Sequence, residues 1–241
     1  MRNAIHHGLI LRAHLIAFLL LFVSFAAHAQ SARRLNTQGY RLYKQKKYVK
    51  AVGKFEKAVE VNPSYALAHY NLACTLGVLH QEGLACDHDA YRSRIMKHLE
   101  EAVRLDPTRK KKMVKDPDLE PVRDMLGYQL LLGLSLKRTA DVKNILKTIT
   151  WYGPAPGAYG PMSGINFEKG KVSVWVMEFE EDMPKHVTTK GTYRVEGNRV
   201  FIRLEKPLEG KREFEGVLTP KGLKIPGLPG RFTDDNDECS A

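Results

Sequence analysis

The chain has 241 residues, of which 43% are hydrophobic and 27% are charged. This length suits one large or two small domains with their own cores, and the composition excludes both a wholly disordered chain and a small disulfide-rich protein, since three cysteines cannot cross-link so long a chain. The formal net charge is +11, with 38 Lys and Arg against 27 Asp and Glu.

Residues 1–29 have the features of a secretory signal peptide. Two arginines precede an apolar stretch at 13–27, and Ala27, His28 and Ala29 provide the small-x-small cleavage pattern. The apolar stretch is shorter than the about 20 residues that a membrane-spanning helix needs. We therefore expect cleavage after Ala29 rather than retention as an anchor. The mature protein is then periplasmic or secreted, with no integral membrane span.

The basic excess lies in one half of the chain. Removing 1–29 takes away two arginines and no acid, which leaves 36 basic and 27 acidic side chains. Residues 30–140 carry 21 basic and 12 acidic side chains, whereas residues 141–241 carry 15 of each. The first half is therefore suited to an acidic partner or an anionic component of the cell envelope. Nucleic acid is not expected, because an exported protein without a reader motif is a poor candidate for it.

The basic half contains a helical pattern that occurs twice. In residues 35–63 the pattern consists of small residues where two helices would touch, aromatic residues between them and a proline that ends the second helix. These residues are Gly39, Tyr48, Ala51, Phe55, Ala58 and Pro63. In the second copy they correspond to Ala73, Ile95, Leu99, Ala102 and Pro107, with no counterpart of Tyr48 assigned. The two prolines are 44 residues apart, so we expect extra residues between the helices of the second copy, at 77–89.

This pattern resembles the tetratricopeptide repeat, whose usual period is about 34 residues. The resemblance covers 35–136, and the helical domain is predicted at 30–136. Residues 115–134 look like the helical cap that often ends such arrays, with one apolar face at Val122, Leu126, Leu130 and Leu134. The resemblance implies a scaffold whose concave surface binds an extended peptide or a partner helix.

The inner helices of such an array would present the partner-binding residues. The candidates for a protein or peptide partner are Asn36, Tyr40, Tyr43, Lys44, Tyr70 and Asn71. In versions of the repeat that bind a C-terminal carboxylate, Lys and Asn occupy set positions. Asn71 matches one of them, but Asn36 and Tyr40 stand where Lys and Asn are expected. We therefore do not expect carboxylate binding.

From Thr148 onward the pattern alternates with a period of two, which predicts short antiparallel strands. Six or seven strands are expected within a small β domain at 141–233, followed by an acidic flexible tail at 234–241. The recurring segments FEKG, GTYRVEGN and a Gly-Leu hairpin resemble lipocalin-like bacterial β-barrels. Small barrels are either filled by side chains or hold one small hydrophobic ligand. The aromatic residues of this half are predicted to belong to its core rather than to a pocket.

Each of the remaining candidate sites has two interpretations. Cys74 and Cys86 either form a disulfide, which export permits, or are buried free thiols. Cys239 lies in the acidic tail and is either free or paired with another chain. The basic run of Arg109, Lys110, Lys111 and Lys112 either contacts an anionic surface or is a solvated connection between helices.

No metal or cofactor site is predicted. His80, Cys86, His88 and Asp89 cluster without a recognised ligand spacing, and the tail lacks the pattern of a calcium loop.

The sequence as a whole predicts an α+β protein with a helical repeat array followed by an antiparallel barrel or sheet. Nucleophile elbows, phosphate loops, metalloprotease helices and thiol-redox pairs are absent from the sequence, so we expect no enzymatic activity. The predicted function is an exported scaffold that mediates protein–protein interaction through the concave face of the repeats. The alternative is a carrier or sensor whose barrel binds a small hydrophobic ligand.

Overall fold

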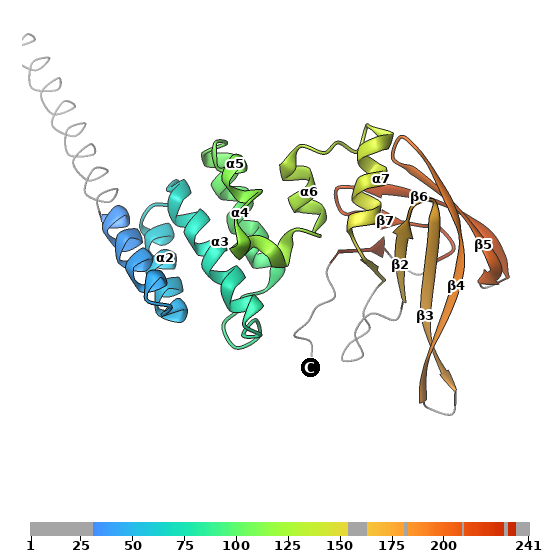
Figure 1. The fold of residues 1–241 in the computed structure, drawn as a ribbon, viewed down its shortest axis with the longest axis horizontal. Helices are drawn as coiled ribbons and strands as arrows, with labels where there is room; N and C mark the ends of the chain where they lie inside the picture. Colours follow the sequence, from blue (N-terminus) through green and yellow to red (C-terminus); the bar gives the residue numbers. More distant parts are fainter. Residues whose placement is uncertain (1–30, 154–162, 181–182, 209, 229–230, 235–241) are drawn as a thin grey trace, which may run out of the picture.

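The computed structural model describes residues 31–153, 163–180, 183–208, 210–228 and 231–234. The predicted signal peptide and nearly all of the predicted acidic tail lie outside these residues. Helices occupy one end of the molecule and an antiparallel sheet the other (Figure 1), which confirms the predicted α+β class. Within the described ranges, no helix combines the length and the apolar character needed to cross a membrane.

The first four helices form the two predicted helical pairs. Helical residues 31–44 pair with α2 (Tyr48–Val61), and α3 (Ala66–Gln81) pairs with α4 (Arg92–Leu105).

Local chemistry explains how these helices touch and where they end. A β-carbon at Gly39 would lie 2.7 Å from the ring of Phe55, so this glycine permits the close contact that the pattern predicted. Helices α2 and α4 end two residues before Pro63 and Pro107, and the residue before each proline is extended, as proline requires of its predecessor.

The extra residues of the second pair are divided between a longer helix and a loop. Helix α3 continues to Gln81, and residues 82–91 then form turns before α4 begins. The amide of Ala90 donates to the carbonyl oxygen of Ala85 (2.8 Å), so the loop closes on itself. His80 Nδ1 lies 3.0 Å from the carbonyl oxygen of Ala90 and fixes this closed loop to the end of α3.

The segment that was predicted to form one capping helix is instead broken. It contains the 3-10 helix η1 (Pro117–Val122) and the helix α6 (Leu126–Leu132), preceded by the short α5 (Arg109–Met113). Pro117 and Pro121 lack amide donors, and Met125 between the two elements has an extended backbone. The predicted apolar face is consequently shared: Val122 packs in the helical core, whereas Leu126, Leu130 and Leu134 contact the barrel core.

The sheet has eight antiparallel strands in sequence order and is nearly closed into a barrel. The strands are β1 (Trp151–Tyr152), β2 (Ser163–Glu168), β3 (Lys171–Glu180), β4 (Met183–Glu196), β5 (Arg199–Leu208), β6 (Lys211–Thr219), β7 (Gly222–Lys224) and β8 (Arg231–Phe232). Tyr152 and Thr233 exchange two backbone hydrogen bonds of 2.8 Å and join the first strand to the end of the last. The sequence prediction missed β8 and the first half of β4.

The barrel core also includes a helix. Val142, Ile145 and Leu146 of α7 (Thr139–Thr148) are fully buried and belong to the same hydrophobic cluster as the inward residues of the strands. Figure 1 shows α7 lying against the sheet. The predicted core aromatics divide into two groups. Trp151, Phe167 and Phe214 are buried, as predicted, whereas Tyr152, Trp175, Tyr193 and Phe201 are half-buried.

Candidate partner-binding groove

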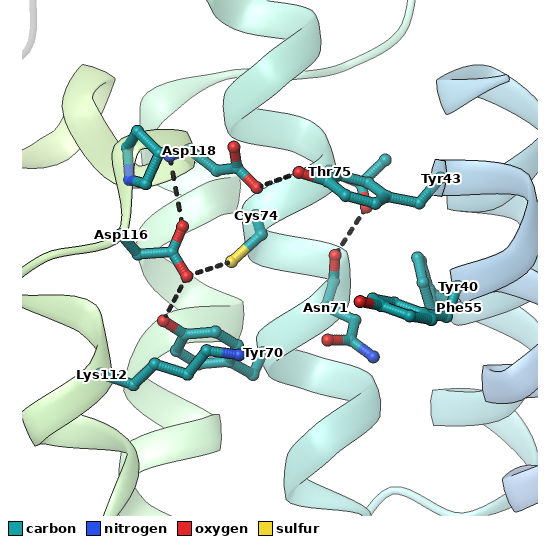
Figure 2. Close-up of a pocket in the computed structure, with 11 residues that line it drawn as sticks. Tyr40, Tyr43, Phe55, Tyr70, Asn71, Cys74, Thr75, Lys112, Asp116 and Asp118 are labelled. Atoms are coloured by element: carbon teal, nitrogen blue, oxygen red, sulfur yellow. Dashed lines mark hydrogen bonds between the residues drawn. The ribbon is translucent and has the colours of Figure 1, made fainter. Parts of the chain in front are cut away.

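The inner side of the helical repeat carries a groove of about 240 Å³ (Figure 2). Four segments supply its walls: helical residues 31–44, helix α2 through one residue, helix α3, and the chain from α5 to η1. The lining residues are Tyr40, Tyr43, Phe55, Tyr70, Asn71, Cys74, Thr75, Lys112, Asp116, Pro117 and Asp118. Four of the six predicted partner-binding residues are among them. Asn36 is buried next to the groove, and Lys44 is exposed at the end of the first helix.

Two asparagines link the inner helices of the repeat. Nδ2 of Asn71 donates to Oδ1 of Asn36 across 2.9 Å. Asn71 lines the groove, and this bond leaves its Oδ1 and the second hydrogen of its Nδ2 for other partners, whereas Asn36 is buried. Tyr40 stacks on Tyr43 with ring centroids 6.2 Å apart, yet 51% of Tyr40 is exposed. The groove therefore presents the amide group of Asn71 beside an exposed aromatic ring.

Two tyrosine hydroxyls point at two carboxylates on the opposite wall. The hydroxyl of Tyr43 donates to Oδ2 of Asp118 (2.6 Å), and that of Tyr70 donates to Oδ2 of Asp116 (2.8 Å). Burial and then the hydrogen bond to Asp118 raise the pKa of Tyr43. Burial, Cys74 and the bond to Asp116 raise the pKa of Tyr70. Both tyrosines are therefore fixed as protonated donors in the neutral range.

The aspartates of the groove were not predicted from the sequence. Asp116 directly precedes η1 and Asp118 lies on it. This 3-10 helix reaches α3 because position 77 of α3 is a glycine: a β-carbon there would be 1.9 Å from the carbonyl oxygen of Asp118. Oδ1 of Asp116 accepts a hydrogen bond from the amide of Asp118 (3.3 Å) and caps η1. Two signals could have indicated this wall: the Asp-Pro-Asp sequence, typical of a helix start, and a glycine inside an apolar helix.

Cys74 lies at the base of the groove between the two walls. Its thiol donates to Oδ2 of Asp116 (S···O 3.6 Å), and burial and then the charges of Asp116 and Asp118 raise its pKa. Ligand atoms of these three residues lie within 4.8 Å of one another, a spacing that one metal ion could bridge. Metal binding needs the thiolate, whereas these surroundings favour the thiol. We therefore assign no metal to this cluster.

The predicted basic run forms α5 and borders the same groove. Nζ of Lys112 lies 5.1 Å from the ring centroid of Tyr70, and the guanidinium of Arg109 lies 5.8 Å from it. Arg109 also pairs with Asp106 across 2.9 Å. Lys110 is half-buried, and Lys111 is exposed. The predicted partner-binding residues and the basic run are therefore neighbours in space.

Neither interpretation of Cys74 and Cys86 holds in full: the two are not bridged to each other, and only Cys74 is a buried free thiol. Cys74 is a buried free thiol, and Cys86 is disulfide-bonded. The thiol of Cys74 faces Asp116 in the groove, whereas Cys86 lies on the loop beyond the end of α3.

The paired helices, with their groove on the inner side, have the architecture of a helical repeat. Residues 39–77 match the family model for the TPR repeat, which is the tetratricopeptide repeat. This segment contains Gly39, Phe55 and Pro63 of the first copy and the start of the second. Comparison with the curated proteins finds no match. The matched segment does not include the barrel, whose resemblance to lipocalin-like domains stays a prediction.

Proposed function

We propose that this protein is an exported, non-catalytic scaffold that binds an extended segment of a partner protein in the groove of its helical repeat. The observation that carries the proposal is the groove itself: it is formed on a TPR repeat and lined by predicted partner-binding residues from two successive inner helices. TPR repeats are typically protein-interaction modules. The export part of the proposal is supported by the leader-like residues 1–29.

The groove offers hydrogen bonds and one apolar contact to a bound segment. Asn71 lines the groove and retains the second hydrogen of Nδ2 and the acceptor Oδ1, neither of which its bond to Asn36 uses. An extended peptide backbone presents the complementary carbonyl and amide groups. The exposed ring of Tyr40 can pack on a side chain of the same segment, because tyrosine combines a large apolar area with few rotatable bonds.

The groove and the exposed side of α5 differ in their charges. The groove lining contains the carboxylates of Asp116 and Asp118 and the ammonium of Lys112, so the inserted side chain should be uncharged or basic. The excess positive charge lies outside the groove, where Lys111 is exposed on α5. If the partner is acidic, its acidic residues therefore flank the inserted segment and contact α5.

The barrel is assigned a structural part in this scaffold. Its inward side chains and those of α7 pack into one hydrophobic cluster, which supports a barrel filled by side chains. The alternative, a carrier for a small hydrophobic ligand, would be supported by lipid that co-purifies with the full chain and is released on unfolding.

The test is site-specific photo-crosslinking from the full chain in envelope extract. A photoreactive phenylalanine replaces Tyr40 in one variant and Val49 in the control; the two positions are 51% and 48% exposed, and only Tyr40 lines the groove. We expect one protein to crosslink at Tyr40 and not at Val49. With that partner purified, Tyr40→Ala should weaken binding about 10-fold, as at an aromatic interface contact, and Val49→Ala should not. Equal crosslinking or equal affinity of the two variants would exclude the groove as the interface.

A further inference from the structure

One wall of the groove is connected to the barrel. This wall, which consists of Asp116, Pro117 and Asp118, lies at the start of η1, and the chain after η1 turns into α6. Asp234, which follows the last barrel strand, and Arg92 of α4 hold this turn from the side of the barrel. We propose that the barrel sets the position of this groove wall, with Arg92 and Asp234 as the positioning residues, an inference that rests on the function proposed above.

Arg92, the first residue of α4, contacts η1 and the end of the barrel together. Its Nε donates to the carbonyl oxygen of Pro121 in η1 (2.8 Å), and its Nη1 donates to the carbonyl oxygen of Asp234 (3.2 Å). Its Nη2 pairs with the carboxylate of Asp124. Only 8% of Arg92 is exposed, and a buried charge is stable only when acceptors such as these surround it. The barrel therefore supplies one of the three acceptors that keep Arg92 in contact with η1.

The side chain of Asp234 holds the other end of the same turn. Its carboxylate accepts a hydrogen bond from the amide of Leu126, the first residue of α6. The first amides of a helix have no partner within that helix, so a residue 108 positions away in the chain satisfies this one. Asp234 thus acts on both sides of the turn: on η1 through Arg92, and on α6 directly.

The closure of the barrel fixes the position of Asp234. The preceding residue, Thr233, exchanges two backbone hydrogen bonds of 2.8 Å with Tyr152 of β1. Phe232 of β8 is fully buried in the barrel core, and Leu126 belongs to the same hydrophobic cluster. The seam between the first and last strands is therefore continuous with the contacts that hold the turn after η1.

The short helix η1 connects these contacts to the groove. It has six residues, of which Asp118 binds Tyr43 across the groove (Figure 2) and Pro121 binds Arg92 on the side of the barrel. A displacement at Pro121 would move Asp118 away from Tyr43, because both residues of η1 lie within about one turn of the same helix. Cys74, which is only 7% exposed at the base of the groove, would then become accessible.

The experiment measures how fast N-ethylmaleimide alkylates Cys74 in the folded full chain, with the product quantified by peptide mass spectrometry. Asp234→Ala removes the bond to α6, and we expect Cys74 to react about fivefold faster, the factor that corresponds to one lost helix cap. Arg92→Met removes the contacts to η1 and to the barrel together and should give a larger increase. Glu215→Ala is the control: it removes an exposed ion pair within the barrel and should leave the rate unchanged.

Low concentrations of urea separate an opening of the groove from unfolding of the whole chain. A local opening exposes little surface, so alkylation through it hardly changes with urea, whereas alkylation through global unfolding rises steeply. We expect the faster alkylation of Asp234→Ala to be independent of urea. A variant that merely destabilises the fold would show the steep dependence instead.

Three results would overturn the proposal: an unchanged rate in Asp234→Ala, an equal acceleration in Glu215→Ala, or an acceleration that follows only the urea-dependent route. If Arg92→Met does not fold, Asp234→Ala alone decides. The alkylation rate is measured without a partner, so it stands whether or not the groove binds one. Crosslinking from Tyr40 tests the binding itself, and the two failures are therefore distinguishable.

Discussion

Gly77 of α3 and Asp118 of η1 approach so closely that a β-carbon on residue 77 would lie 1.9 Å from the carbonyl oxygen of residue 118. This contact brings the second wall of the groove to the inner helices. It places Asp118 within hydrogen-bond distance of Tyr43 and Asp116 within hydrogen-bond distance of Tyr70 (Figure 2). The position of the second groove wall therefore depends on the absence of a side chain at Gly77.

Substitution of this glycine should open the groove. Gly77→Ala forces η1 away from α3, and overpacking of this kind costs about 1–3 kcal/mol of unfolding free energy. Urea unfolding followed by circular dichroism at 222 nm measures the loss.

Gly53→Ala is the matched control for this substitution, since position 53 is inside α2 with no heavy atom within 4 Å of the added carbon. It should stabilise the protein by about 0.5–1 kcal/mol, because alanine favours a helix over glycine. If Gly77→Ala stabilised the protein to the same extent, the contact with η1 would be disproved.

Local rules predicted the repeat well and the groove in part. Gly39 against Phe55, and the helix ends before Pro63 and Pro107, follow from steric and backbone restrictions that act over a few residues. Helical spacing also placed Tyr40 and Asn71 on inner helices.

Contacts between distant parts of the chain were not predicted by these local rules. The approach of η1 to α3 joins residues about 40 positions apart, and no periodic pattern encodes it. Helix α7 has the amphipathic pattern of a repeat helix, but the face it buries lies in the barrel core. The first half of β4 reads Lys-His-Val-Thr-Thr-Lys over much of its length and lacks the apolar alternation by which the other strands were recognised.

The charge of Asp118 should reduce the stability of the folded protein at neutral pH. Burial, and then the neighbouring charge of Asp116, raise its pKa, while Tyr43 and Lys112 act in the opposite direction. Because the pKa of Asp118 is higher in the folded state than in the unfolded chain, its protonated carboxyl stabilises the fold fully below pH 3.8. This contribution is lost as the pH rises through the pKa of the folded state. Asp118→Asn keeps an acceptor for Tyr43 and removes the charge.

We therefore expect Asp118→Asn to be more stable than the wild type at pH 7, with the difference vanishing near pH 3. Urea unfolding of both proteins across this range provides the measurement. A constant difference at all pH values would show that the charge of Asp118 is not responsible.

His98 should make the helical repeat sensitive to mild acid. Nε2 of His69 lies 2.9 Å from the carbonyl oxygen of Pro63 and must donate to it, so Nδ1 of His69 accepts from Nδ1 of His98 (3.1 Å). Burial, followed by electrostatic interaction with His69, Arg94 and Lys97, lowers the pKa of His98 to about 4. The neutral ring is therefore favoured in the folded state.

The lowered pKa of His98 changes stability with pH in the opposite direction to the raised pKa of Asp118. The stabilising contribution is present above pH 6.5 and is lost as the pH falls from 6.5 to about 4, because only the unfolded chain binds a proton over that range. The slope is at most about 1.4 kcal/mol per pH unit for one proton. His98→Gln keeps a donor for His69 but does not titrate, so its unfolding free energy should fall less steeply between pH 6.5 and 4. Equal slopes for the two proteins would contradict the assignment.

The packing of α7 predicts that this helix unfolds with the barrel. Ile145 is fully buried in the barrel core, and Ile145→Ala should cost about 2–5 kcal/mol through the cavity it leaves. The chain has two tryptophans, Trp151 and Trp175, and both are on strands, so their fluorescence reports the barrel alone. The urea midpoint measured by fluorescence should therefore fall in Ile145→Ala. Lys143→Ala, on the exposed face of the same helix, should stay within about 0.5 kcal/mol of the wild type. If Ile145→Ala shifted only the helical signal at 222 nm, α7 would belong to the repeat array, and the barrel would begin after it.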